Sequence, residues 1–131
     1  MMIVMLFLGV FFSCGEKEID SGENQNVEVP HFSSLENEIF GLSCAFSSCH
    51  GSGTGGLTLD GIDDYARLVD VESISVSGAI LVVPGDSSAS YLITKMRGSL
   101  GMVGGIMPPG GMDEELILRV ERWIDAGAIQ D

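Results

Sequence analysis

The chain has 131 residues, enough for one modest domain, and it carries 6 Lys and Arg residues against 19 Asp and Glu residues. The resulting formal net charge of −13 argues against binding to nucleic acid, which rewards basic surfaces, and against electrostatic binding to anionic lipid. It favours protein partners with basic docking patches, although solubility alone would also explain it.

The first 13 residues are typical of an export signal. Residues 3–13 form an unbroken run of apolar and small side chains, which fits a signal-peptide core and is short for a membrane span. Cys14 follows at once, and the chain then turns polar. This arrangement resembles a bacterial lipoprotein signal, which is cut before a cysteine that then becomes lipidated. We therefore expect a lipid on Cys14 and a membrane-anchored protein on the periplasmic or cell-surface side, with an uncleaved anchor or plain secretion as alternatives.

Residues 14–31 are predicted to be a flexible tether, because they are polar and acidic and show no apolar periodicity. The folded domain is expected to span residues 32–131. Its many glycines limit the apolar area that an ordered chain can bury, which favours stabilisation by a large cofactor.

Four helices are expected in this domain, at residues 34–44, 60–70, 86–97 and 113–126. Apolar residues recur in each at the spacing of one helix face, which includes Leu42 in the first helix and Ile62 in the second. Asp64 is interpreted as a surface charge near a helix start, and Asp86 as a helix cap. Trp123 is expected in the core, packing the last helix against the first. No segment predicts a sheet, so the expected fold class is all-α.

Residues 98–112 form the longest loop of the predicted domain. They contain six glycines and two prolines and cannot hold a helix. A loop of this length within a compact domain indicates a functional role. It also carries three methionines, Met102, Met107 and Met112, whose thioethers are candidate ligands.

The chemistry-bearing segment is Cys44-Ala45-Phe46-Ser47-Ser48-Cys49-His50. Cys-x-x-Cys-His is the attachment signature of c-type haem, in which two thiols add to the porphyrin vinyl groups and the histidine binds the iron. Here four residues separate Cys44 and Cys49 instead of two. The longer loop can still span two vinyl groups, because the porphyrin fixes their positions and the extra residues can bulge.

Two other interpretations of the cysteine pair remain open. Cys44 and Cys49 could form a disulfide in an exported domain. Alternatively, both cysteines together with His50 and His31 could bind zinc, although adjacent ligands at 49 and 50 suit one tetrahedral ion poorly. His31 is otherwise interpreted as a surface residue.

Short motifs follow the cysteine pair in a fixed order: Gly-Gly-Leu-Thr-Leu (55–59), Val-Pro-Gly-Asp (83–86), Ser-Tyr-Leu (90–92), Met-Pro-Pro-Gly (107–110) and Trp-Ile-Asp-Ala-Gly-Ala (123–128). This order resembles the monohaem cytochrome c domains of planctomycetes and myxobacteria, over residues 34–128. The resemblance implies a cytochrome c-like fold of about four helices whose glycine-rich loops wrap around one haem c. It also implies covalent attachment at Cys44 and Cys49, with His50 and Met107 as iron ligands and Met102 and Met112 as rivals to Met107.

An iron bound by both histidine and methionine has no open position for a substrate or gas, and this ligand pair suits one-electron transfer. We therefore expect an exported electron carrier that passes single electrons between redox partner proteins and is not an enzyme. The alternatives are a haem enzyme, a gas or redox sensor domain, or a haem-less binding module that contains a disulfide.

Overall fold

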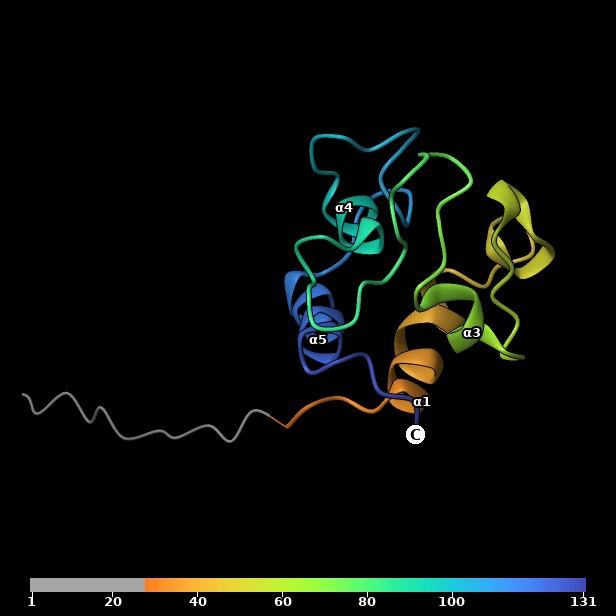
Figure 1. Cartoon of the computed structure of the whole chain (residues 1–131). Coiled ribbons are helices and arrows are strands. Elements are labelled where there is room, and N and C mark those ends of the chain that lie inside the picture. Colours follow the sequence, from red (N-terminus) through yellow and green to blue (C-terminus); the bar gives the residue numbers. More distant parts are fainter. Residues whose placement is uncertain (1–27) are drawn as a thin grey trace, which may run out of the picture.

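The structure, a computed structural model, describes residues 28–131 (Figure 1). The expectations for the export signal, Cys14 and most of the tether lie outside these residues. All elements in the described part of the chain are helical, and loops join them. This part contains three isolated β-bridges and no strand. The expected all-α class is confirmed for this part of the chain. None of its helices combines the length and apolar character that a bilayer span requires.

The first helical segment is interrupted by a π-turn. It consists of α1 (Phe32–Leu35), a π-helical turn η1 (Glu36–Phe40) and α2 (Gly41–Ser43). The wider π-turn changes the angle between successive side chains, so the face that begins with buried Leu35 and Ile39 continues at Phe40. Leu42, expected on this face, is 66% exposed, and that prediction was wrong.

The second predicted helix is shorter than expected. After two 3-10 turns, η2 (His50–Ser52) and η3 (Thr54–Gly56), helix α3 covers only Asp64–Leu68. Asp64 is buried, contrary to prediction, because its carboxylate accepts hydrogen bonds from the N–H groups of Asp60 and Gly61, each at 3.1 Å. The turn that these bonds close leaves Ile62 exposed and outside the helix.

Helix α4 (Tyr91–Arg97) begins later than the sequence suggested. Asp86 accepts hydrogen bonds from the Ser88 hydroxyl at 2.6 Å and from the Ala89 N–H at 3.0 Å, so it closes a turn instead of capping the helix. Buried Ser90 precedes the helix, and its hydroxyl accepts from the Val83 N–H at 2.9 Å. Local side-chain bonds to the main chain thus compete with helix formation over residues 86–90.

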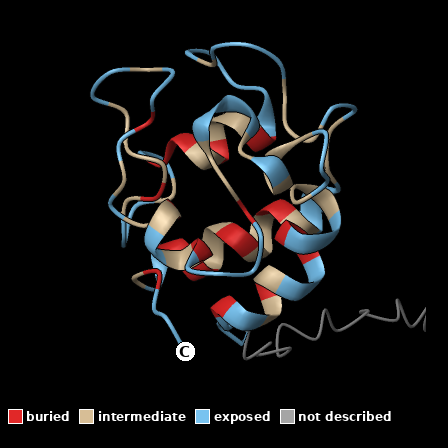
Figure 2. Ribbon diagram, turned by 90° about the vertical axis from the view of Figure 1, so that its right-hand side faces the viewer, coloured by how far each residue is buried: buried red, intermediate tan, exposed pale blue. Residues whose placement is uncertain are grey.

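The last helix, α5 (Glu114–Asp125), agrees with prediction to within one residue at each end. Its buried stripe includes Trp123, whose ring centroid lies 5.4 Å from that of Phe32 in α1. The predicted packing of the last helix on the first is therefore confirmed. Figure 2 shows the buried positions gathered on the inner faces of the helices, with the loops largely exposed.

The helices form two sides around a central space. In Figure 1, α4 and α5 lie on one side of the molecule, and α1 and α3 lie on the other. At the base, the Ser33 N–H and hydroxyl donate to the Asp131 carboxylate at 3.0 and 2.5 Å. His31 is exposed and lies 3.8 Å from the same carboxylate, which places it at the surface as expected.

Candidate functional site

A cavity of about 690 Å³ lies between the two sides of the molecule. This volume falls within the ~300–1,000 Å³ that is typical of ligand and cofactor sites. Much of its wall is apolar, including Phe40, Leu57, Leu59, Leu68, Leu81 and Leu92. All four residues that the sequence assigned to cofactor binding line it: Cys44, Cys49, His50 and Met107.

His50 is held by main-chain bonds on both of its sides. Its N–H donates to the Cys44 carbonyl at 3.0 Å, and its carbonyl accepts from the Leu59 N–H at 2.9 Å. The ring nitrogen Nδ1 lies 3.0 Å from the Leu57 carbonyl oxygen. Because a carbonyl can only accept, Nδ1 carries the proton of the neutral ring, and Nε2 keeps its electron pair free.

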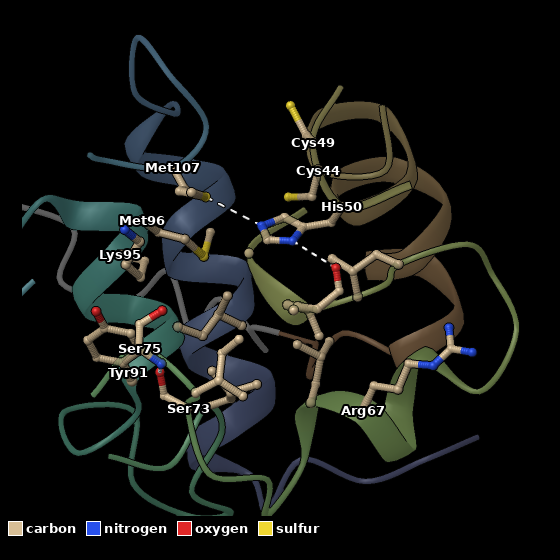
Figure 3. A pocket seen from close by; sticks show the side chains of 18 of the residues that line it. Cys44, Cys49, His50, Arg67, Ser73, Ser75, Tyr91, Lys95, Met96 and Met107 are labelled. Atoms are coloured by element: carbon tan, nitrogen blue, oxygen red, sulfur yellow. Dashed lines mark hydrogen bonds between the residues drawn. The ribbon is translucent and has the colours of Figure 1, made fainter. Parts of the chain in front are cut away.

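That free nitrogen faces Met107. The distance from His50 Nε2 to the Met107 sulfur is 3.4 Å (Figure 3). Both atoms can donate an electron pair. A metal ion, which accepts electron pairs, could therefore bind both of them. Two trans ligands of one ion would lie ~4–5 Å apart, given bonds of about 2.0 Å to nitrogen and 2.3 Å to sulfur. The observed contact is about 1 Å shorter, a difference that the flexible thioether side chain can accommodate.

Helix α4 positions the loop that carries Met107. The Met107 N–H donates to the Lys95 carbonyl at 3.0 Å. The Lys95 ammonium donates to the carbonyls of Val103 and Gly105 at 2.8 and 2.6 Å. The Val103 N–H in turn donates to the Tyr91 hydroxyl at 3.1 Å. The glycine-rich loop is therefore ordered by bonds to one face of a short helix.

The rival methionines differ in position. Met102 and Met112 are absent from the cavity wall, whereas Met96 of α4 lines the cavity and is only 3% exposed. The sequence did not predict Met96 as a ligand, because its place on the inner face of a predicted helix is typical of a core residue. Only its position in the cavity wall makes it a candidate.

The two cysteines are half-buried free thiols on the same side of the cavity as His50 (Figure 3). Burial, and to a lesser degree the neighbouring Cys49, raises the pKa of the Cys44 thiol to about 11. Cys44 is therefore protonated at neutral pH. The thiolate is the form that binds metal ions and attacks disulfides, and burial disfavours this form at Cys44.

The other two interpretations of this segment are not realised in the structure. Cys44 and Cys49 form no disulfide with each other. Within residues 28–131, no three His, Cys, Asp or Glu side chains come together in a set that could hold a metal ion. The zinc set of both cysteines with His50 and His31 is consequently not assembled.

A close main-chain contact shapes the loop between the cysteines. A Cβ atom at Gly51 would lie 2.2 Å from the Ala45 carbonyl oxygen, far inside van der Waals contact. Only glycine lets the residue after His50 approach the loop this closely. In the same turn, the His50 N–H donates to the Cys44 carbonyl at 3.0 Å. Together these contacts help to fix the backbone position of His50.

Comparisons with protein-family models, with curated proteins and with solved structures give no match for this chain. The residues of the cavity therefore carry the functional interpretation by themselves.

Proposed function

We propose that this chain is a c-type cytochrome that carries single electrons, with one haem held through Cys44 and Cys49 and with His50 and Met107 as axial ligands. The observation that carries the proposal is the 3.4 Å approach of His50 Nε2 to the Met107 sulfur inside an apolar cavity that two free thiols also line. A haem bound there would supply the change of the iron between its ferric and ferrous states.

The thiols are suited to covalent attachment. Each would add its sulfur and its hydrogen across one vinyl double bond, an addition without oxidant or leaving group. Both cysteines are free thiols, so the hydrogen for this addition comes from the thiol itself. Cys49 precedes His50 directly, and this fixes the thiol and the imidazole in one short stretch of chain.

The histidine is prepared to act as a ligand. The Leu57 carbonyl accepts from Nδ1 at 3.0 Å, which fixes both the tautomer and the direction of the ring. A hydrogen bond of this kind also raises the basicity of the opposite nitrogen, and so strengthens its bond to a metal. Met107 offers a soft sulfur on the other side, and histidine–methionine ligation raises the reduction potential.

Because His50 and Met107 would both bind the iron, the proposal favours a carrier over a haem enzyme or a gas sensor, which keeps a position for a substrate or a gas. A spectrum of the reduced protein with and without carbon monoxide distinguishes a carrier from an enzyme or a sensor. A carrier with both ligands in place changes little when the gas is added, whereas an enzyme or a sensor binds it.

The N-terminal features extend the proposal to the location of the protein. Removal of residues 1–13 and lipidation of Cys14 would leave the domain on an acidic tether at a membrane, facing the periplasm or the cell exterior. Redox proteins with basic docking patches are the proposed partners of this acidic chain. Intact-mass analysis of the mature protein checks the anchoring, and a chain that keeps residues 1–13 or lacks a lipid contradicts it.

The decisive experiment is expression with a cytochrome c maturation system, followed by a denaturing gel stained for haem peroxidase activity and a pyridine haemochrome spectrum. The wild-type chain should keep haem through denaturation, and a Cys44→Ala/Cys49→Ala variant should lose it. Cys14→Ser is the matched control, because it removes the third cysteine and leaves the attachment pair. A wild-type chain without covalent haem, or a double variant that retains it, would refute the proposal.

A further inference from the structure

The cavity has a polar end that lies away from the cysteines. In Figure 3, Ser73, Ser75 and Tyr91 lie toward the end of the cavity opposite Cys44 and Cys49, with Lys95 on the same side as Tyr91. Three hydroxyl side chains at one end of such a cavity, with Lys95 between them and Met107, indicate a ligand with a polar part at that end.

Two of these side chains have hydrogen-bond donors that are buried and unused. Ser73 and Tyr91 are each 7% exposed. The Ser73 hydroxyl accepts from the Ser75 N–H at 3.2 Å, and the Tyr91 hydroxyl accepts from the Val103 N–H at 3.1 Å. Neither hydroxyl donates its own hydrogen to any residue in the described part of the chain. A buried hydroxyl whose hydrogen has no acceptor is destabilising, so both hydroxyls favour an acceptor in the cavity.

The charges around the cavity include one positive side chain that an anion could approach, although Glu72 also keeps its negative charge. The titratable or charged side chains along the wall are Cys44, Cys49, His50, Arg67, Glu72, Tyr91 and Lys95. Arg67 is paired with Asp60 and Asp64. The Glu72 carboxylate accepts a hydrogen bond from the Gly78 N–H at 2.6 Å. Lys95 contacts only carbonyl oxygens and forms no ion pair within residues 28–131, so its positive charge is not neutralised there.

We infer that this end of the cavity binds the carboxylate arms of the haem, with the Ser73 and Tyr91 hydroxyls as donors and the Lys95 ammonium as the nearby positive charge. The inference rests on the proposed function. A haem carries its vinyl groups and its carboxylates toward opposite edges of the ring. Attachment of the vinyl edge at Cys44 and Cys49 therefore directs the carboxylates toward Ser73 and Tyr91.

Resonance Raman spectroscopy of the haem-loaded protein tests this contact directly, because the bending mode of a haem carboxylate arm falls in frequency when the carboxylate loses a hydrogen bond. Ser73→Ala and Tyr91→Phe should each shift this band to lower frequency, and Ser73→Thr, which keeps a hydroxyl, should restore it. Tyr65→Phe is the matched control, because the Tyr65 hydroxyl donates to the Ala128 carbonyl at 2.9 Å and lies outside the cavity wall.

The outcomes separate this inference from the proposed function. Covalent haem in the wild type, together with an unshifted band in both Ser73→Ala and Tyr91→Phe, overturns the inference and leaves the proposed function intact. A wild-type chain without covalent haem overturns both. Tyr91→Phe also removes the acceptor of the Val103 N–H, so the near-infrared sulfur-to-iron band is recorded to detect any change at Met107. Ser73 forms no hydrogen bond with residues 98–112 in the described structure. If Tyr91→Phe changes the sulfur-to-iron band, the carboxylate band of Ser73→Ala therefore decides the inference.

Discussion

The main-chain carbonyl of Lys95 accepts a hydrogen bond from the N–H of Met107 at 3.0 Å, and the ammonium of the same lysine binds the carbonyls of Val103 and Gly105. One residue of α4 thus holds the 98–112 loop at three points. The loop is rich in glycine and has little order of its own, so these bonds determine where the methionine sulfur lies.

Replacing Lys95 with methionine should loosen this loop, because the aliphatic stem is kept while the two ammonium bonds are lost. A hydrogen bond to a charged group contributes about 1.5–3 kcal/mol, so amide exchange over residues 103–107 should speed up by roughly tenfold or more. Hydrogen–deuterium exchange with mass spectrometry measures this. Arg119→Gln is the control, since it removes an ion pair with Glu38 at the surface. Equal exchange in Lys95→Met and wild type would contradict the role of Lys95.

Replacing Met107 with alanine should remove the distal ligand of a haem-loaded protein. We expect loss of the near-infrared sulfur-to-iron band of the oxidised protein, a lower reduction potential and binding of carbon monoxide by the reduced protein. Met96→Leu and Met102→Leu should keep the band. Met96→Leu is the sharper comparison, because Met96 lines the same cavity whereas Met102 does not. Loss of the band in Met96→Leu alone would transfer the ligand role to Met96.

Cys44 should make the haem-free protein less stable at high pH. Its pKa is raised from an ordinary value of 9.0 to about 11 by burial. Below pH 9 the thiol is protonated in both the folded and the unfolded state and contributes no pH dependence. Between these values the unfolded chain loses the proton first, so the free energy of unfolding falls as the pH rises, by roughly 2–3 kcal/mol in total. Urea unfolding from about pH 8 to about pH 11 in the presence of a reductant should show this fall in the wild type and a smaller one in Cys44→Ser.

Gly51→Ala should disturb the loop between the cysteines. The added methyl group would lie 2.2 Å from the Ala45 carbonyl oxygen, and forcing such a contact costs about 1–3 kcal/mol. We expect a lower melting temperature and a lower yield of covalent haem. Gly105→Ala is a matched control, because a Cβ at Gly105 meets nothing within 4 Å and its backbone is not left-handed. If both variants melt and load haem alike, the close approach at Gly51 is unimportant.

The site was predictable from the sequence where short motifs fix local geometry. Cys49 and His50 are adjacent in the chain, and Met107 stands just before two prolines in a loop that cannot be helical. These residues line one cavity in the structure. The bounds of α5 were also predictable from the sequence, because its apolar stripe is regular and acidic residues fill its first turn.

The remaining features depend on contacts that periodicity does not encode. A π-turn in the first helical segment exposed Leu42, since the predicted face assumed uniform α-helical spacing. Asp64 became buried because main-chain N–H groups lie within reach of its carboxylate. The sequence pattern places Tyr91 on the inner face of a helix. It does not predict the contact of Tyr91 with the 98–112 loop, because that contact comes from tertiary packing.

The packing of Phe32 in α1 against Trp123 in α5 also bears on the order of events during folding. Contacts between segments so far apart in the chain form late, because the intervening loop must close first. While the contact between Phe32 and Trp123 is unformed, α5 does not yet cover the first helical segment, which leads to Cys44, Cys49 and His50. The proposed addition of the two thiols to a haem would therefore meet the least steric barrier before folding is complete. The N–H of Met107 donates to the Lys95 carbonyl of α4, so the sulfur would approach His50 only after that helix has formed.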